Sequence, residues 1–133
     1  MRVKECMCSN VVYTNPGDTI ENVARLMNEN HIGCIPVCEA EGKVVGFVTD
    51  RDIILRSIAC GKNCSDTKVS DIMTTQVIKT TPDTELEEVT KTMSENQIRR
   101  LPVIENGKVV GMLTLGDIAR NEAISKEKLV NTV

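Results

Sequence analysis

The chain has 133 residues, with 16 basic and 19 acidic side chains and a formal net charge of −3. Hydrophobic residues make up 41% and charged residues 26%, which is the composition of a folded globular domain and excludes a disordered chain. Aromatic residues make up only 2%, and neither half of the chain is strongly basic, so we expect no nucleic-acid partner.

No apolar run approaches the roughly 20 residues that a membrane span needs, and we expect no membrane partner. The opening segment MRVKECMCSN lacks the apolar stretch of a signal peptide, which favours a cytoplasmic protein. The six cysteines have CxC and CxxxC spacings instead of the CxxC pairs of most zinc sites, so we expect reduced thiols and no metal. A metal clip at Cys60 and Cys64 remains an alternative.

The first expected element is a short strand at Val11–Thr14, ended by the turn sequence at 15–17. A helix follows, which Thr19 or Asp18 can cap at its N-terminus. Its apolar residues recur at helical spacing, which predicts one buried stripe: Ile20, Val23 and Met27.

Two strands come next, at Cys34–Cys38 and at residues 43–49, joined by a short turn. A second helix is predicted at Asp52–Cys60, with Gly61 at its end, where a helix commonly stops. The order strand, helix, strand, strand, helix therefore accounts for residues 11–60.

The same order recurs further along the chain. Residues 11–39 align with 77–105 at an offset of 66, and residues 42–54 align with 107–119 at an offset of 65. The lost residue falls in a turn, which in the second copy contains the hairpin signal Asn106-Gly107. We therefore expect an α/β (α+β) fold of two β-α-β-β-α repeats packed together, with domains at 1–66 and 67–133 and a weakly patterned tail at 125–133.

Each repeat contains the pattern G-x-x-T-x-x-D at the junction of its last strand and helix. Free N–H groups at a helix start favour a phosphate, to which Thr49 or Thr114 can add a hydroxyl. Asp52 or Asp117 offers two acceptor oxygens, which suit the two hydroxyls of a ribose. The alternative is purely structural, because Thr is a common N-cap and Asp in a first turn stabilises a helix by ~0.3–1 kcal/mol.

The strings GFVTDRD at 46–52 and GMLTLGD at 111–117 each follow a strand with IPV or LPV, and a Met-containing lead-in also recurs at 5–7 and 71–74. This ordered set, present twice, resembles a tandem pair of CBS domains (a Bateman module) of the small stand-alone bacterial type. The resemblance covers nearly the whole chain, from about Val3 to Ala119. It implies adenosine-containing ligands bound in clefts between the repeats. The positions that it implies for ligand contacts are Thr14, Cys34, Ile35, Pro36, Thr49, Asp52, Thr80, Arg99, Arg100, Leu101, Pro102, Thr114 and Asp117.

The two copies differ just before IPV and LPV. The first copy has the small, uncharged Gly33 and Cys34, whereas the second has Arg99 and Arg100. A guanidinium can bind a phosphate through two parallel hydrogen bonds, so we expect at least one of the two arginines to contact phosphate and the two ligand sites to be unequal. A solvated edge, or pairing with Glu95 and Glu105, is the alternative.

No catalytic residue is predicted, because nothing in the sequence supplies a nucleophile or an orienting partner for His31, the only histidine. The leading hypothesis is a regulatory sensor, a homodimer, that takes an adenosine nucleotide as regulatory ligand and acts on a separate effector protein. The competing hypothesis is an interaction or scaffold protein whose clefts are empty. An enzyme is the third and least favoured interpretation.

Overall fold

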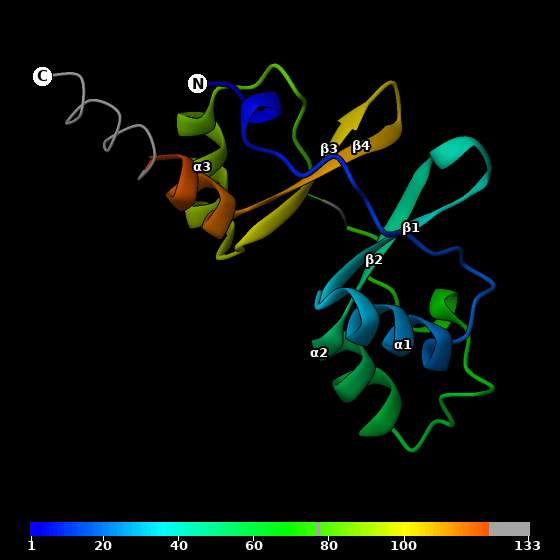
Figure 1. Cartoon of the computed structure of the whole chain (residues 1–133). Helices are drawn as coiled ribbons and strands as arrows, with labels where there is room; N and C mark the ends of the chain where they lie inside the picture. The colour runs from blue at the N-terminus through cyan, green and yellow to red at the C-terminus, as the bar shows by residue number, and fades with distance from the viewer. Residues whose placement is uncertain (77, 123–133) are drawn as a thin grey trace, which may run out of the picture. The chain divides into compact units, whose positions relative to one another are not determined.

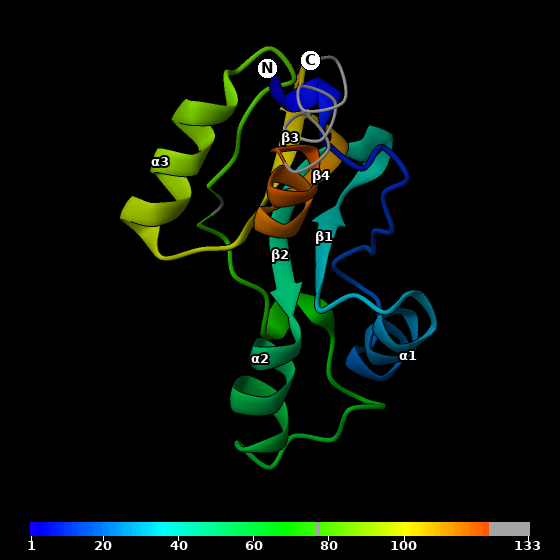
Figure 2. The same ribbon diagram turned by 60° about the vertical axis from the view of Figure 1, so that its left-hand side comes forward.

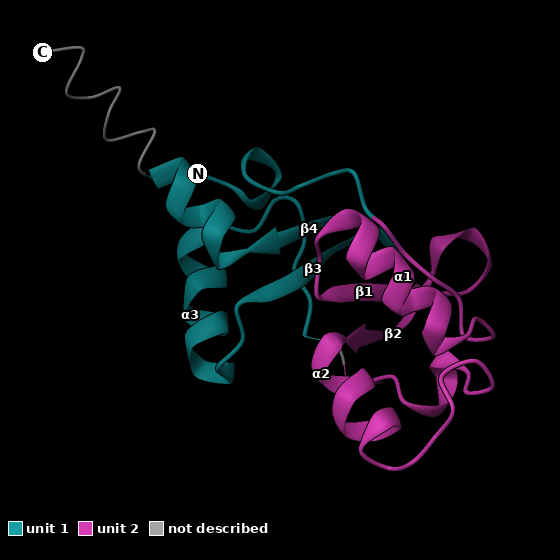
Figure 3. Cartoon of the chain, turned by 60° about the horizontal axis from the view of Figure 1, so that its bottom comes forward, with its two compact units in different colours: residues 1–11, 78–133 teal, residues 12–77 magenta. Residues whose placement is uncertain are grey.

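The computed structural model describes residues 1–76 and 78–122, so the predicted tail at 125–133 lies outside the described residues. The chain divides into two compact units, one of Val12–Val77 and one of Met1–Val11 together with Ile78–Val133 (Figure 3). Each unit has an antiparallel hairpin with helices against it, which confirms the predicted α+β class. No helix in the described ranges is both long and apolar enough to cross a membrane.

The unit of residues 12–77 is built around one hairpin and its flanking helices (Figure 1). Its elements are α1 (Ile20–Asn30), β1 (Cys34–Cys38), the 3-10 turn η2 (Ala40–Gly42), β2 (Val44–Thr49), α2 (Asp50–Asp52), the π-helical η3 (Ile53–Ile58) and the 3-10 turn η4 (Val69–Asp71). Figure 2 shows α2 beginning directly where β2 ends.

The other unit repeats this plan with an N-terminal segment added. Its elements are the 3-10 turn η1 (Val3–Glu5), α3 (Leu86–Asn96), β3 (Arg100–Glu105) and β4 (Lys108–Thr114). Residues 115–122 are helical and follow β4 as α2 follows β2.

Local sequence explains α1 and α3. The Thr19 hydroxyl accepts a hydrogen bond from the backbone N–H of Asn22 at 3.2 Å, so Thr19, and not Asp18, is the N-cap of α1. Both helices end on a residue with left-handed backbone, His31 and Gln97, each at φ 54°. The predicted apolar stripes are buried against the hairpins: Ile20, Val23, Met27, Leu86, Val89 and Met93.

The four hairpin strands lie within one residue of their predicted bounds. The turn between the strands is one residue shorter in the second repeat than in the first, as the alignment predicts. Asn106 and Gly107 have φ of 54° and 77°, the two left-handed residues of a tight hairpin turn. In the first copy, Glu41 and Gly42 have φ of 66° and 80° in a turn one residue longer.

Two predictions about the elements need correction. The strand expected at Val11–Thr14 is reduced to one parallel bridge between Thr14 and Val37, and Thr80 makes the equivalent bridge with Val103. The helix expected at Asp52–Cys60 begins at Asp50 and changes to π-helical turns over Ile53–Ile58. The register change lets the backbone N–H of Ala59 bond the carbonyl of Ile54, five residues back.

The lead-in segments determine which residues form each compact unit. Cys8 exchanges two backbone hydrogen bonds with Met112, at 2.8 and 2.9 Å, and Thr74 exchanges two with Phe47, at 2.7 and 2.8 Å. Each repeat's lead-in therefore adds to the hairpin of the other repeat. The compact units accordingly differ from the expected domains 1–66 and 67–133, because residues 1–11 and 67–76 change places.

The glycine that opens each G-x-x-T-x-x-D pattern permits this pairing. A Cβ on Gly46 would lie 2.8 Å from the Thr74 carbonyl oxygen, and one on Gly111 would lie 2.7 Å from the Met7 sulfur. Both distances are below van der Waals contact, so only glycine lets the lead-in lie this close to the strand.

Candidate functional site

The candidate site residues gather at one end of each hairpin, where the first strand starts and the second ends. Cys34 is directly opposite Thr49, and Arg100 is directly opposite Thr114. Opposed residues of an antiparallel pair project from the same face of the hairpin, so each pair shares a face. Backbone hydrogen bonds close this end: Asp50 N–H to the Gly33 carbonyl at 2.9 Å, and Leu115 N–H to the Arg99 carbonyl at 2.7 Å.

Thr49 and Asp52 form a reciprocal cap at the start of α2. The Asp52 N–H donates to the Thr49 hydroxyl at 3.0 Å, and the Thr49 N–H donates to the Asp52 carboxylate at 3.0 Å. Thr114 and Asp117 repeat both bonds at 3.0 and 3.1 Å. The structural interpretation of this motif is therefore present in both repeats. The Asp side chains remain 13% and 14% exposed, so each carboxylate edge still reaches the surface.

An arginine forms an ion pair with the second oxygen of each of these carboxylates. The Arg56 Nε lies 3.8 Å from the Asp52 Oδ1, and Arg120 pairs with the Asp117 Oδ1. Arg56 also donates to the Ile72 carbonyl at 3.2 Å, which ties the helix to the lead-in. Sequence reasoning missed both arginines, although spacings of i+4 and i+3 on a helix were a readable signal.

Arg99 and Arg100 are exposed and no described residue forms an ion pair with either of them. Glu95, one of the two carboxylates considered as a partner, instead lies 3.9 Å from the Lys91 ammonium. The alternative in which Arg99 and Arg100 pair with Glu95 and Glu105 is thus not seen among the described residues. Two guanidinium groups at this end of the second hairpin keep their donors available.

The residues of the IPV and LPV segments are buried. Ile35 is 0% and Leu101 2% exposed, and Pro36 and Pro102 are buried beside them. Because the side chains of Ile35 and Leu101 are buried, we expect these two residues to contact a ligand through their main-chain groups.

Thr14 and Thr80 occupy equivalent positions but have different partners. The Thr14 hydroxyl donates to the Asp18 carboxylate at 2.8 Å, and the Asn22 side-chain amide donates to the same carboxylate at 2.7 Å. Burial alone would raise the pKa of Asp18, but the hydrogen bonds from Asn22, Thr14 and the Thr19 N–H outweigh it and leave the pKa below its ordinary value. Thr14 is thus part of a closed polar network, and its contact with a ligand stays a prediction.

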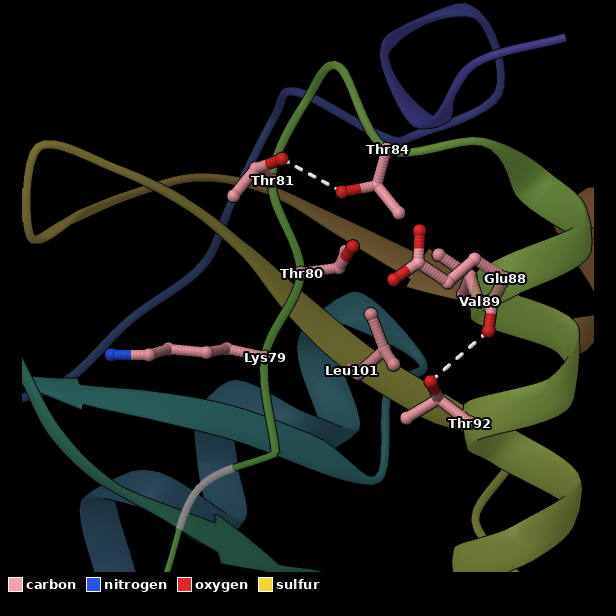
Figure 4. Close-up of a pocket in the computed structure, with 8 residues that line it drawn as sticks. All are labelled: Lys79, Thr80, Thr81, Thr84, Glu88, Val89, Thr92 and Leu101. Atoms are coloured by element: carbon pink, nitrogen blue, oxygen red, sulfur yellow. Dashed lines mark hydrogen bonds between the residues drawn. The ribbon is translucent and has the colours of Figure 1, made fainter.

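Thr80 instead lines a pocket of about 170 Å³ within its unit (Figure 4). Of the positions implied by the resemblance, the pocket includes Thr80 and Leu101 and leaves out Arg99, Arg100, Thr114 and Asp117. The other lining residues, which sequence reasoning did not single out, are Lys79, Thr81, Thr84, Glu88, Val89 and Thr92.

In the described part of the chain none of the six cysteines forms a disulfide, and no group of three or more ligating side chains is close enough to hold an ion. The Cys60 thiol donates to the Leu55 carbonyl at 3.5 Å, whereas the Cys64 thiol contacts the Ser57 hydroxyl at 3.8 Å. Cys6 and Cys38 are buried as small apolar residues, and burial raises the pKa of the Cys38 thiol.

Comparison with known families supports the resemblance. The CBS domain family matches residues 3–58 and again residues 69–123. The chain belongs to the CBS-domain family. The two matches form one tandem pair within these 133 residues, and proteins of this family are in general regulatory and not catalytic.

The matches to related proteins cover most of this chain and most of each relative. The CBS domain-containing protein YhcV of Bacillus subtilis is 40% identical over 120 residues, which cover 90% of this chain and 84% of YhcV. The CBS pair of protein MJ0100, solved with 5′-methylthioadenosine and S-adenosyl-L-methionine, has a TM-score of 0.83 at 27% identity and covers 94% of this chain and 98% of its own. A hexameric CBS-CP12 protein from bloom-forming cyanobacteria has a TM-score of 0.78 at 27% identity, covering 90% of this chain and 66% of its own.

Proposed function

We propose that this CBS pair is a regulatory module that binds an adenosine-containing nucleotide and passes its ligand state to a separate effector protein. The observation that carries the proposal is the hairpin end that both repeats share, where a helix start, a threonine and a partly exposed aspartate lie together. The MJ0100 pair, of the same fold, is described in complex with two adenosine compounds, which supports this ligand class.

The roles of the residues follow from their chemistry. Asp52 and Asp117 accept ribose hydroxyls, since a carboxylate repels phosphate. The hydroxyls of Thr49 and Thr114 donate to phosphate oxygens, to which Arg99 and Arg100 add charge in the second repeat. The helix-start N–H groups of the first repeat are not assigned to phosphate, because the N–H groups of residues 50–52 already bond the Gly33 carbonyl, the Asp50 carboxylate and the Thr49 hydroxyl. In the buried segments, further contacts use mainly main-chain groups. The remaining residues proposed to contact the ligand are Thr14, Cys34, Ile35, Pro36, Thr80, Leu101 and Pro102.

The proposal includes self-association and a cytoplasmic location. Three aliphatic side chains on the helix that follows β2 are about half exposed, and covering them in a homodimer would remove apolar surface from water: Ile54, Leu55 and Ile58. A CBS-CP12 structure of similar fold is described as a hexamer, which supports the proposal of self-association. No residue is proposed as catalytic.

The first experiment asks what the protein retains on purification. With one tyrosine and no tryptophan the chain absorbs little at 280 nm, so a bound adenine compound would dominate near 260 nm. Mass spectrometry of the denatured supernatant then identifies it. Calorimetric titration with AMP, ADP, ATP, 5′-methylthioadenosine and S-adenosyl-L-methionine supplies the affinities, and absence of binding by all five would reject the sensor proposal.

One observation favours a second candidate, a scaffold with unoccupied sites. Asp52 already has partners for both carboxylate oxygens within its unit, namely the Thr49 N–H, the Thr74 hydroxyl at 3.4 Å and Arg56. A carboxylate so engaged is stable without a ligand. Self-association that is unchanged by every adenosine compound, in a protein that binds none of them, would favour the scaffold.

A further inference from the structure

The pocket beside α3 is distinct from the hairpin end of the proposed nucleotide site. Its floor includes Leu101, which is opposite Leu113 and projects toward the buried core of the unit. Arg100 and Thr114, one position along each strand, project from the other face of the same hairpin, because successive residues of a strand alternate. The pocket therefore lies on the opposite face of the hairpin from Arg100 and Thr114, although two of its lining residues, Thr80 and Leu101, are also among the positions proposed to contact the nucleotide.

The same positions of the first repeat carry a different polar arrangement. In the first repeat, the carboxylate of Asp18 accepts hydrogen bonds from Thr14 and Asn22. At an offset of 66, Asp18 becomes Thr84 and Asn22 becomes Glu88. The acidic group has thus moved from the loop to the helix, and the network of the first repeat cannot form in the second.

Apart from the Lys79 ammonium, two polar side chains of the pocket are left for a ligand. The Thr81 and Thr84 hydroxyls bond each other at 2.7 Å, and the Thr92 hydroxyl donates to the Glu88 carbonyl at 3.0 Å. Within the described residues, neither the Glu88 carboxylate nor the Thr80 hydroxyl has a hydrogen bond or ion pair. Figure 4 shows the Glu88 carboxylate directed toward Thr80 and Thr84, while Lys79 extends away from them.

We propose that this pocket binds a small organic ammonium ion, a primary amine on a short carbon chain. The ammonium would donate charge-assisted hydrogen bonds to the Glu88 carboxylate and to the Thr80 hydroxyl. The carbon chain would lie over Val89 and Leu101. A volume of about 170 Å³ is below the ~300 Å³ of the smallest typical pockets for drug-sized ligands, which favours a small ligand over a whole nucleotide.

The experiment is a titration followed by amide chemical shifts, with n-propylammonium chloride as the probe at constant ionic strength. Because Glu88 is exposed, we expect weak binding, with a dissociation constant on the order of 1 mM. Saturable shifts confined to residues 79–84, 88–92 and 101 are the expected result. 1-Propanol and potassium chloride are the matched probes; equal shifts with 1-propanol would overturn the charge recognition, and saturation by potassium would assign the pocket to an inorganic cation.

Three variants sharpen the result. Glu88→Gln should weaken the amine by roughly 2- to 5-fold, the range of an exposed ion pair, whereas Glu87→Gln, an equally acidic first-turn position outside the pocket, should not weaken it. The double variant Thr84→Asp with Glu88→Asn restores the first repeat's network and should close the pocket. Undiminished binding in Glu88→Gln or in the double variant would refute the site. Binding of adenosine compounds is measured in parallel and is expected to survive all three changes, so this proposal and the nucleotide proposal fail separately.

Discussion

Asp52 and Asp117 combine a structural contact with the proposed ligand contact, and the two can be separated by substitution. One carboxylate oxygen caps the helix and the other faces an arginine. An asparagine keeps an oxygen for the cap and loses the charge. The choice between sensor and scaffold therefore rests on what the charge does.

We expect Asp52→Asn and Asp117→Asn each to weaken an adenosine ligand by roughly 10- to 150-fold, the loss of a charged hydrogen bond worth ~1.5–3 kcal/mol. The free energy of unfolding should change by no more than ~1 kcal/mol, since the cap is kept. Calorimetry and urea denaturation give the two numbers. Asp50→Asn, an exposed neighbour, is the control, and a 2′-deoxy ligand should reproduce the defect in the unmodified protein. Lost stability with full affinity would leave these aspartates only a structural role.

Arg99 and Arg100 are expected to distinguish the two repeats by phosphate number. Arg99→Ala and Arg100→Ala should lose more affinity for ATP than for AMP, and more for AMP than for adenosine, because each phosphate adds charge. The loss should shrink at high salt, where exposed pairs are screened over ~8–10 Å. Calorimetry at two salt concentrations measures it. Equal losses for adenosine and ATP would show that the arginines do not contact phosphate, and two identical sites in the unmodified protein would disprove the asymmetry.

The lowered pKa of Asp18 in the first repeat predicts that the stability of the protein depends on pH. Its pKa in the folded protein lies below the ordinary value of 3.8, so its stabilising contribution is complete above about pH 4 and is lost as the pH falls toward the lower folded-state pKa. Asp18→Asn should therefore lose less stability than the unmodified protein between pH 5 and pH 2.5. Urea midpoints across this range test the slope. Asp66→Asn is the control for an exposed carboxylate and should keep the original slope, and an unaltered slope in Asp18→Asn would contradict the assignment.

At the scale of elements, each hairpin pairs with the lead-in segment of the other repeat through a single β-bridge. The sequence alignment predicts the hairpin because alternation and the turn are local, whereas the lead-in pairs with a strand of the other repeat. A glycine stands at each crossing for a steric reason.

Gly46→Ala and Gly111→Ala should each destabilise the protein by about 1–3 kcal/mol, the usual cost of forcing an extra methyl group into a packed site. Gly116→Ala is the matched control, because its Cβ would meet nothing closer than 3.7 Å and the residue is helical. Alanine there should be neutral or stabilising by up to ~1 kcal/mol. Urea denaturation ranks the three variants, and a Gly46→Ala variant as stable as Gly116→Ala would show that the lead-in pairing is not tight.

At the scale of the whole molecule, the proposed homodimer is the property most open to test. Ile54, Leu55 and Ile58 are 55%, 48% and 59% exposed on one short helix. In the second repeat the aligned positions 54 and 55 carry Ala119 and Arg120, so the aliphatic face is specific to the first repeat.

Ile58→Glu is expected to convert the dimer to monomer, because it places a charge in surface that the partner must desolvate. Sedimentation velocity across a concentration series measures the change. Tyr13→Glu, at a 60% exposed residue outside this helix, should leave the association constant unaltered. A dimer that persists in Ile58→Glu would move the interface elsewhere, and a monomeric unmodified protein would remove this part of the proposal.

The sequence by itself determined the features that depend on near neighbours. The duplication, the four hairpin strands, the Asn106-Gly107 turn and the buried stripes of α1 and α3 follow from periodicity and turn chemistry within a few residues. The Thr–Asp pairs at 49–52 and 114–117 were readable for the same reason, because their hydrogen bonds span three residues.

Only the tertiary structure decided the pairings between distant segments. The exchange of lead-ins joins Cys8 to Met112 and Thr74 to Phe47, and no local pattern specifies which strand edge a short segment selects. The closed network at Thr14 and the pocket at Thr80 also needed coordinates, since the same threonine stands in both repeats and its surroundings decide its partner. Local backbone preferences fix the elements, but the free energy that places one element against another comes from hydrogen bonds and packing that appear only when the chain is folded.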